Sequence, residues 1–343
     1  MKVIDLFAGC GGFSTGFIEA GFDITHAVEF DESIAQTYAL NHPNTDLIVD
    51  DIKNVDNNNV LANITADVII GGSPCQGFSM AGARIRQNCQ FIDDPRNYLF
   101  KHYLNIVKHI QPSVFVFENV KGIQTMNKGE IFKEIMDSFE KLVYNVHYKV
   151  FKMDELGIPQ TRERMIIIGS VTPWDFDELI KHTKDRIVAN MPSFFTPTTA
   201  WEVISDLEKL PTDGTAKIAN HTATNHAKIA TDRMKKVKNG KNFTSLDDDI
   251  KSVHSGSYGR LEKDKPAPTI TTRFDTPSGG KFTHPTLDRT ITPREAARIQ
   301  SFDDNFVFLG NRTSICRQIG NAVPPKVAYF LAELVKELLS HEQ

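Results

Sequence analysis

The chain has few cysteines, no long apolar run and no histidine pattern typical of a metal site. Its four cysteines, among 343 residues, form no C-x-x-C pair, so we expect neither a zinc cluster nor a disulfide framework. The histidines contain no H-E-x-x-H segment, and no metal site is predicted. No apolar stretch approaches the roughly 18 residues of a membrane span, and residues 1–5 lack the pattern of a signal peptide. These absences predict a cytoplasmic protein without a membrane partner.

A strong net charge is also lacking, because 39 Lys and Arg stand against 43 Asp and Glu. The balance differs along the chain: residues 181–325 hold 22 basic and 16 acidic residues, whereas the remainder holds 17 and 27. Phosphate contacts need locally clustered cations rather than a basic whole. We interpret the basic part as a candidate surface for an anion, while noting that a solvated face has the same composition.

Apolar runs and helical periods predict the fold class. Over the first 170 residues they predict strands at 3–7, 24–30, 47–49, 67–71, 114–118, 146–151 and 165–169, with helices at 13–20, 32–40, 97–110 and 129–142. Strands that alternate with helices indicate an α/β protein with a doubly wound, mostly parallel sheet. After Gly169 the alternation stops. From about 186 to 290 the many Thr, Asn, Lys, Gly and Pro residues predict a smaller lobe of irregular or β-rich build, with a helix at 201–210.

Two helices are predicted after this lobe. Thr292 and Pro293 are a typical helix start, because Thr can cap the helix and Pro fits its first turn. Apolar residues at helical spacing over 325–339 predict a terminal helix that packs on the first lobe.

Polar groups follow the first predicted strands at the point where each strand ends. The Gly-rich turn at residues 8–12 lets backbone N–H groups approach a ligand at a helix N-terminus. Glu29 ends the second strand, where an acid can accept both ribose hydroxyls of an adenosine ligand, and Asp51 follows the third. This series indicates an adenosine cofactor but does not separate NAD from S-adenosylmethionine.

The next two strands end in groups suited to covalent chemistry. Cys75 follows the fourth strand after a rigid Pro, and a thiol beside a cofactor pocket is well placed to be a nucleophile. Glu118 closes the apolar strand 114–117, where an acid can hold or donate a proton.

Five segments in order resemble the cytosine-5 DNA methyltransferase family, particularly its bacterial restriction–modification type. They are DLFAGCGG (5–12), PCQGFS (74–79), ENV (118–120), QTRER (160–164) and QIGNAVPP (318–325). The resemblance covers nearly the whole chain except about 175–255. It implies the S-adenosylmethionine-dependent methyltransferase fold, a bacterial or phage-encoded enzyme, and a role in DNA methylation.

The resemblance also implies roles for individual residues. Cys75 matches the thiolate that adds to C6 of a cytosine flipped out of duplex DNA, which is a known route for methyltransferases. Glu118 matches the acid at the N3/N4 edge, Arg164 the arginine on the O2 side, and Arg162 a support of the pocket. The family's methyl donor is S-adenosyl-L-methionine, and its product is S-adenosyl-L-homocysteine. The matching cofactor residues are Phe7, Gly9, Gly11, Gly12, Glu29, Asp51, Ile52, Pro74, Leu99, Asn321 and Val323.

The predicted domains are a catalytic, cofactor-binding domain of residues 1–185 and 316–343 and a target-recognition domain of residues 186–315. A segment from 79 to about 97 is our candidate for a loop that closes over the flipped base. Cys10 is interpreted as packing, and neither Cys89 nor Cys316 has a predicted role. Candidate DNA contacts are Ser79, Arg84, Gln87, Arg260, Thr269, Ile270 and Arg273, with Lys281 as a further cation.

Three alternatives stay open from sequence: a tRNA substrate, a DNA-binding module with an inactive site, and a dinucleotide oxidoreductase. Against a tRNA substrate, the segment after Pro-Cys-Gln is of the DNA type. Against an inactive site, Cys75, Glu118 and Arg164 occur together. An oxidoreductase would leave the QTRER segment unexplained. We therefore predict a monomeric DNA (cytosine-5-)-methyltransferase with double-stranded DNA as its partner and a cognate restriction endonuclease acting on the same site.

Overall fold

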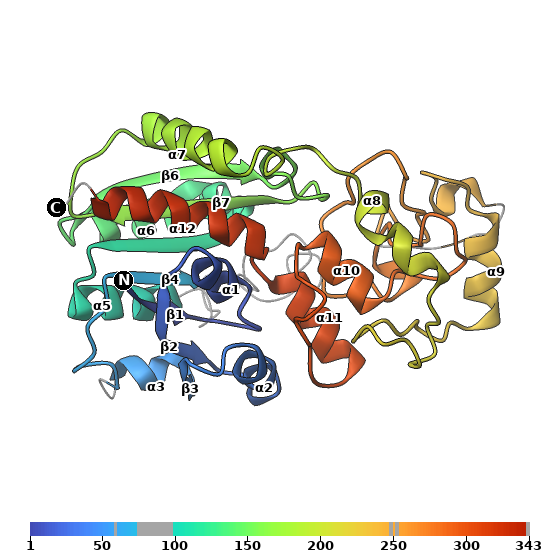
Figure 1. The fold of residues 1–343 in the computed structure, drawn as a ribbon, viewed down its shortest axis with the longest axis horizontal. Helices are drawn as coiled ribbons and strands as arrows, with labels where there is room; N and C mark the ends of the chain where they lie inside the picture. The colour runs from blue at the N-terminus through green and yellow to red at the C-terminus, as the bar shows by residue number, and fades with distance from the viewer. Residues whose placement is uncertain (58–59, 74–98, 247–249, 251–253, 341–343) are drawn as a thin grey trace.

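A single mixed sheet forms the larger part of the computed structural model, which describes residues 1–57, 60–73, 99–246, 250 and 254–340. The sheet order is β3-β2-β1-β4-β5-β7-β6 (Figure 1). β1 to β5 pair parallel, whereas β7 lies antiparallel between β5 and β6. The predicted mostly parallel sheet is confirmed. The strands are β1 (Lys2–Leu6), β2 (Asp23–Glu29), β3 (Asp46–Val49), β4 (Val68–Gly72), β5 (Val114–Val120), β6 (Asn145–Lys152) and β7 (Glu163–Ser170).

The α-helices follow the strands and continue beyond the sheet. They are α1 (Gly12–Glu19), α2 (Glu32–Asn41), α3 (Ile52–Asn57), α5 (Leu99–Ile110), α6 (Glu130–Glu140), α7 (Phe176–Asn190), α8 (Ala200–Ile204), α9 (Lys228–Lys236), α10 (Pro293–Ile299), α11 (Arg312–Asn321) and α12 (Pro325–Ser340). Short 3-10 turns lie at η3 (Lys121–Gln124), η4 (Met126–Gly129), η5 (Asp154–Leu156), η6 (Ser205–Lys209), η7 (Phe243–Ser245) and η8 (Pro277–Gly279). Within the described ranges, no helix combines the length and apolarity needed to cross a bilayer.

Both faces of the sheet are buried, because alternate side chains of each central strand enter different cores. In β5, Val114 and Val116 join the core with α1, α7 and α12, whereas Phe115 and Phe117 join the core with α3, α5 and α6. Side chains alternate across a strand, so an apolar run without alternation needs helices on both faces. The doubly wound architecture follows from this pattern.

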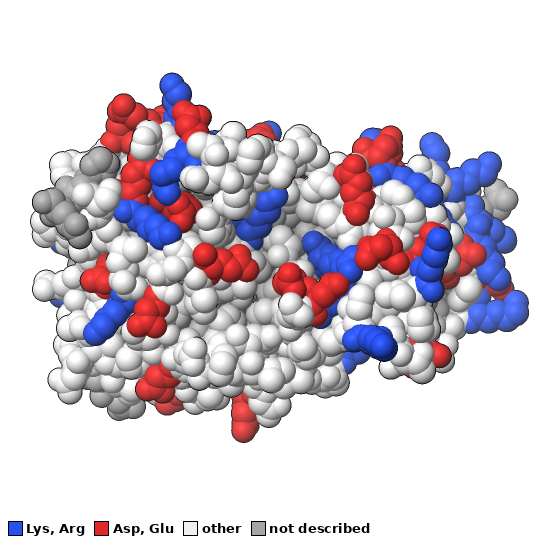
Figure 2. All heavy atoms as spheres, viewed as in Figure 1, with Lys and Arg blue, Asp and Glu red and all other residues white. Residues whose placement is uncertain are grey.

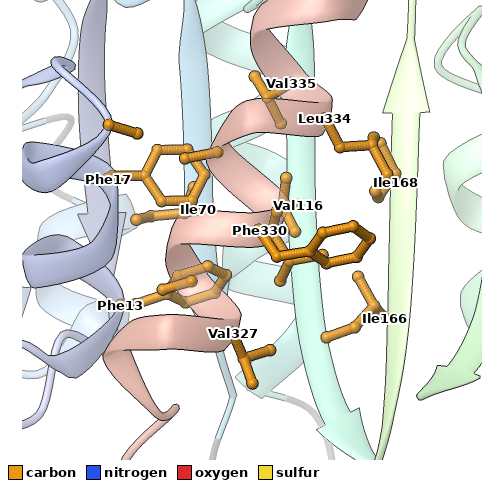
Figure 3. Packing of buried hydrophobic residues seen from close by; sticks show 14 of the residues in the cluster. Phe13, Phe17, Ile70, Val116, Ile166, Ile168, Val327, Phe330, Leu334 and Val335 are labelled. Carbon is orange, nitrogen blue, oxygen red and sulfur yellow. The ribbon is translucent and has the colours of Figure 1, made fainter. Parts of the chain in front are cut away.

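The terminal helix packs on the first lobe, as predicted from its apolar spacing. Figure 3 shows Phe330 of α12 beside Val116 of β5 and Ile166 of β7, with Phe13 and Phe17 of α1 across the helix. The chain therefore returns from the second lobe to complete the core that its first helix began.

The second lobe lies beside the sheet and contains α8 to α11 (Figure 1). Its core includes Phe274, Phe282, Ile291 and Phe302, all buried. The irregular build is confirmed, but the predicted β-rich character is wrong for the described part. Residues 186–315 contribute only isolated bridges there, at Gln160↔Ala267, Asp213↔Thr222, Arg260↔Thr283 and Thr283↔Thr290. The described part of this lobe forms turns and short helices, because its segments of alternating polar residues have no neighbouring strand with which to pair.

Local signals placed α10 correctly, while several other helices were not predicted. Thr292 Oγ1 accepts from Glu295 N (3.2 Å) and Glu295 Oε2 accepts from Thr292 N (2.7 Å), which is a capping box. The unpredicted helices include α3, α7, α9 and α11. α7 has a clear start, because the Asp175 side chain accepts from Glu178 N (2.9 Å).

Candidate active site at the carboxyl edge of the sheet

One edge of the sheet collects the predicted site residues. The carboxyl ends of β1 to β5 lie at this edge because these strands are parallel, and the antiparallel β7 begins there. Loops at such an edge are where ligands bind in open α/β sheets. The ends of β1, β2 and β3 lead into the predicted cofactor residues Phe7, Glu29 and Asp51. The end of β5 and the start of β7 carry the predicted catalytic residues Glu118 and Arg164.

The turn after β1 is wound in the left-handed region. Phe7, Gly9 and Gly11 have φ of 62°, 58° and 95°, and Phe7 is strained there because it carries a Cβ. Gly12 begins α1 so close to the returning chain that a Cβ on it would lie 2.3 Å from the carbonyl oxygen of Val323. The turn, the start of α1 and the segment before α12 therefore meet at one place.

Glu29 closes β2 and faces this turn. Its Oε2 accepts a hydrogen bond from Gly9 N (2.9 Å), and its Oε1 accepts one from Asp31 N (2.8 Å). Burial raises the pKa of Glu29 above its ordinary value. Phe30 follows directly and is 71% exposed. Phe30 was not among the predicted site residues, because the sequence placed it at the end of the strand predicted over 24–30.

The other described residues that were predicted to bind the cofactor differ in their burial. Asp51 is half-buried and its carboxylate caps the first turn of α3. Ile52 is buried in the core beneath, and Leu99 packs partly against that core from the start of α5. Asn321 is exposed at the end of α11.

A buried polar chain lies under the turn. Asp5 is 1% exposed and its Oδ2 accepts from Ser14 Oγ (2.6 Å), which in turn lies 2.8 Å from the Tyr38 hydroxyl. Burial raises the pKa of Asp5 to about 7. The three side chains join β1, α1 and α2, so they hold the turn that carries the predicted cofactor residues.

The raised pKa of Asp5 predicts a pH dependence of stability. The folded protein keeps this proton up to about pH 7, whereas the ordinary value is 3.8, so between these values the folded state binds more protons and loses stability as pH rises. Asp5→Asn keeps an acceptor for Ser14 and cannot ionise. We expect the free energy of unfolding of the wild type to fall, relative to D5N, by roughly 2–3 kcal/mol between pH 5 and pH 8 in urea titrations. Parallel pH profiles would contradict this.

The predicted acid and arginine of the catalytic set form an ion pair. Arg164 Nε lies 2.8 Å from Glu118 Oε1, and the two side chains are 16% and 13% exposed. The next residue, Asn119, is buried and its Nδ2 donates to Ser73 Oγ (3.2 Å). The end of β5 is thereby tied both to the start of β7 and to the last described residue before segment 74–98.

Arg162 lies deeper than Arg164 and joins distant segments. It is 1% exposed, and its Nη1 donates to the carbonyl oxygens of Ile270 (3.3 Å) and Gly320 (3.0 Å). Burial lowers the pKa of Arg162 well below its ordinary value, with the neighbouring charge of Arg164 acting in the same direction. Its position agrees with a supporting role rather than with direct access to a ligand.

The two thiols of the described residues, those of Cys10 and Cys316, are buried. Burial raises the pKa of Cys10 and of Cys316 to about 12, so neither is a thiolate near neutral pH. The burial of Cys10 agrees with its interpretation as packing, and Cys316 was given no predicted role. Segment 74–98 lies outside the described residues, and with it Cys89 and the predicted site residues Pro74, Cys75, Ser79, Arg84 and Gln87.

The structure corrects the interpretation of Arg260 as a DNA contact. Its side chain is buried, and Nη2 lies 2.8 Å from Asp288 Oδ1. The guanidinium also donates to the carbonyl oxygens of Met234, Val237, His284 and Leu287. An arginine with its donors committed in this way cannot also bind a phosphate, so Arg260 holds the second lobe together.

The other described DNA candidates differ in accessibility. Ile270 is fully buried in the core of the second lobe, so its prediction as a DNA contact is wrong, whereas Thr269 is half-buried and Arg273 is exposed. Figure 2 shows Lys and Arg gathered at the end of the molecule where α9 lies. Exposed lysines of α9 and of the residues directly after it are Lys228, Lys235, Lys236, Lys238 and Lys241.

Comparisons with known proteins agree with this arrangement. Residues 1–337 match the C-5 cytosine-specific DNA methylase family. Type II methyltransferase M1.HphI from Haemophilus parahaemolyticus is 37% identical over 347 residues, which cover 100% of this chain and 88% of that protein. Type II methyltransferase M.DdeI from Desulfomicrobium norvegicum is 32% identical over 381 residues, which cover 98% and 88%.

Solved structures share the fold over the whole chain. The Dnmt2 methyltransferase of S. pombe superimposes with a TM-score of 0.66 at 16% identity, covering 100% of this chain and 99% of that one. A prophage-encoded E. coli protein superimposes with a TM-score of 0.75 at 27% identity, covering 99% of both chains. Because the family match spans residues 1–337 and relatives above 30% identity cover nearly the whole chain, the chain belongs to the C-5 cytosine-specific DNA methylase family.

Proposed function

We propose that this chain is the modification enzyme of a restriction–modification system and methylates C5 of one cytosine in duplex DNA. The observation that carries the proposal is the ion pair of Glu118 and Arg164, which stands beside the strand end that leads into PCQGFS. Identity to Type II methyltransferases over nearly the whole chain supports it. We propose a monomer that shares its DNA site with a cognate endonuclease.

The reaction we assign to these residues proceeds by addition and elimination. Cytosine C5 is a weak nucleophile, so the Cys75 thiolate first forms a bond to C6 and the ring electrons move toward C5. Glu118 holds the N3/N4 edge, where a proton offsets the developing negative charge, and Arg164 holds O2. After methyl transfer, loss of the C5 proton and cleavage of the S–C6 bond restore the ring. Because C6 is stacked inside a duplex, the base must be flipped out.

The described residues fit S-adenosyl-L-methionine, which supplies the methyl group when bound. Each oxygen of Glu29 holds one backbone N–H and has a second lone pair for a ribose hydroxyl. Among the described residues, none apart from its chain neighbours has an atom within 4 Å of a Cβ built on Gly9, so this part of the structure leaves room at the turn. We assign Phe30 as an apolar wall for the adenine because of its exposure beside Glu29. Phe7, Asp51, Leu99 and Asn321 complete the candidate pocket.

We propose residues 186–315 as the target-recognition domain and the rest as the catalytic domain. Arg273 and the exposed lysines near α9 are the candidate phosphate contacts, because they are accessible and of the required charge. Contacts to phosphates position the duplex without reading its sequence.

Bisulfite sequencing tests the proposed reaction. Unmethylated plasmid DNA is incubated with the protein and S-adenosyl-L-methionine, with Cys75→Ala as the control. We expect cytosines in one short sequence context to be protected by the wild type alone. If no cytosine is protected, while S-adenosyl-L-homocysteine and not NAD raises the melting temperature, the DNA substrate is wrong and tRNA is tested next. Stabilisation by NAD alone would overturn the cofactor assignment as well.

A further inference from the structure

The two lobes are joined by buried contacts between two segments, which we call the arginine segment (159–164) and the recognition segment (267–273). Gln160 and Ala267 form a parallel bridge. Ala267 N donates to Pro159 O, and Thr161 N donates to Ala267 O, each at 2.8 Å. The arginine segment continues directly into β7 and so carries Arg164 into its pair with Glu118.

The peptide groups of Ile270 are held from both sides by the arginine segment. Ile270 N donates to Gln160 Oε1 (2.8 Å), and its carbonyl oxygen accepts from Arg162 Nη1 (3.3 Å). Residues two apart in extended chain point to the same side, so Gln160 and Arg162 reach the recognition segment together.

A second glutamine extends this contact. Gln160 Nε2 donates to Gln300 Oε1 (2.8 Å), and Gln300 Nε2 donates to Ile319 O (2.6 Å). Both side chains are fully buried, and their amides are oriented by these partners. The relay runs from Ile270 through Gln160 and Gln300 to α11. Because a buried amide without a partner is costly, the relay favours one arrangement of the segments.

The end of α11 closes the same junction. A Cβ on Gly320 would lie 2.6 Å from the carbonyl carbon of Thr271, so the helix end and the recognition segment are in backbone contact. Gly320 O also accepts from Arg162 Nη1 (3.0 Å). Four chain segments from both lobes therefore meet around two glutamines and one arginine.

We propose that Gln160 and Gln300 are positioning residues for methyl transfer. They hold the recognition segment at a set distance from the Glu118–Arg164 pair, so that DNA seated on the second lobe presents its target base to the catalytic groups. Neither glutamine faces a substrate, since both are buried. The proposal rests on the proposed function, because it assumes that the reaction needs DNA aligned between the two lobes.

The test compares Gln160→Met with a matched control, Gln318→Met. Gln318 is also a buried amide, but its Nε2 donates to Leu309 O (2.9 Å) and Ser314 Oγ (3.2 Å), close to it in the chain. We expect Q160M to lower kcat/KM for DNA about tenfold, because the buried Ile270 N–H and Gln300 Oε1 both lose their hydrogen-bond partner. We expect the dissociation constant of S-adenosyl-L-homocysteine to stay within twofold. Q318M should lose melting temperature but keep its kcat/KM.

Hydrogen exchange gives a readout that does not need activity. The Ile270 amide should exchange about tenfold faster in Q160M than in the wild type, and at the wild-type rate in Q318M. If Q160M does not fold, Gln300→Met interrupts the same relay from its other end. Equal losses of kcat/KM in Q160M and Q318M, or an unchanged Ile270 amide, would overturn the proposal. A wild type that methylates no DNA while the exchange difference holds would instead overturn the proposed function.

Discussion

Cys75→Ser is expected to abolish methyl transfer, by about 10⁴-fold or more, while cofactor binding is retained. Serine is nearly isosteric, but its hydroxyl is far less ionised than a thiol near neutral pH and cannot add to C6 at a useful rate. The measurement is transfer of labelled methyl groups from S-adenosyl-L-methionine to DNA. Binding of S-adenosyl-L-homocysteine is followed by calorimetry in the same preparation.

The matched control for this prediction is Cys89→Ser, which replaces a thiol of the same segment that has no predicted role. The two buried thiols, Cys10 and Cys316, need no separate control because burial keeps them protonated, with a pKa of about 12 each. Full activity of C75S, or equal losses in C75S and C89S, would contradict the assignment of Cys75 as the nucleophile.

Glu118→Gln is expected to lower kcat by about 10²- to 10⁴-fold with little change in DNA affinity. The amide keeps the size of the side chain, yet it cannot release or retain a proton as a carboxyl group does. It also removes the negative charge that lies 2.8 Å from Arg164 Nε, so the arginine loses its orienting partner. Single-turnover methylation and equilibrium DNA binding separate the two effects.

Glu163→Gln is the control for the Glu118 variant. Glu163 begins β7 at the same edge, but its carboxylate pairs with Lys121 Nζ (3.0 Å) in an exposed position, where an ion pair contributes little. We expect E163Q to stay within about twofold of the wild type. An unchanged kcat in E118Q would remove the proposed role of Glu118 in the reaction.

Much of the first lobe could be predicted from the sequence, because its signals are local. The β5 run Val114–Phe117 is apolar without alternation, and this pattern requires burial on both faces. The cap at Thr292 and the apolar spacing of α12 likewise depend on residues within a few positions of each other. These elements can be predicted from the sequence because they do not depend on residues far away in the chain.

The failures of sequence reasoning concern residues whose surroundings come from far along the chain. Arg260 has the charge expected of a DNA contact, but its hydrogen-bond partners include Met234 and Asp288. The residues next to Arg260 in the sequence do not indicate that these distant segments bury it. The predicted β-rich lobe failed for a similar reason, because polar alternation makes a strand only where a partner strand is present. Phe30 was not predicted as a site residue, because its exposure beside Glu29 is a property of the folded chain.

The sequence by itself determined the family, the doubly wound sheet and the identity of the chemical groups, since each depends on residue types in short ordered segments. Only the tertiary structure decided how those groups meet. The antiparallel insertion of β7 beside β5 brings Arg164 to Glu118, although 46 residues separate them in the chain. Likewise, the relay joins the two lobes through a hydrogen bond between Gln160 and Gln300, which lie 140 residues apart in the chain. Pairings at such distances are selected by the packing of the whole chain, because no local propensity specifies them.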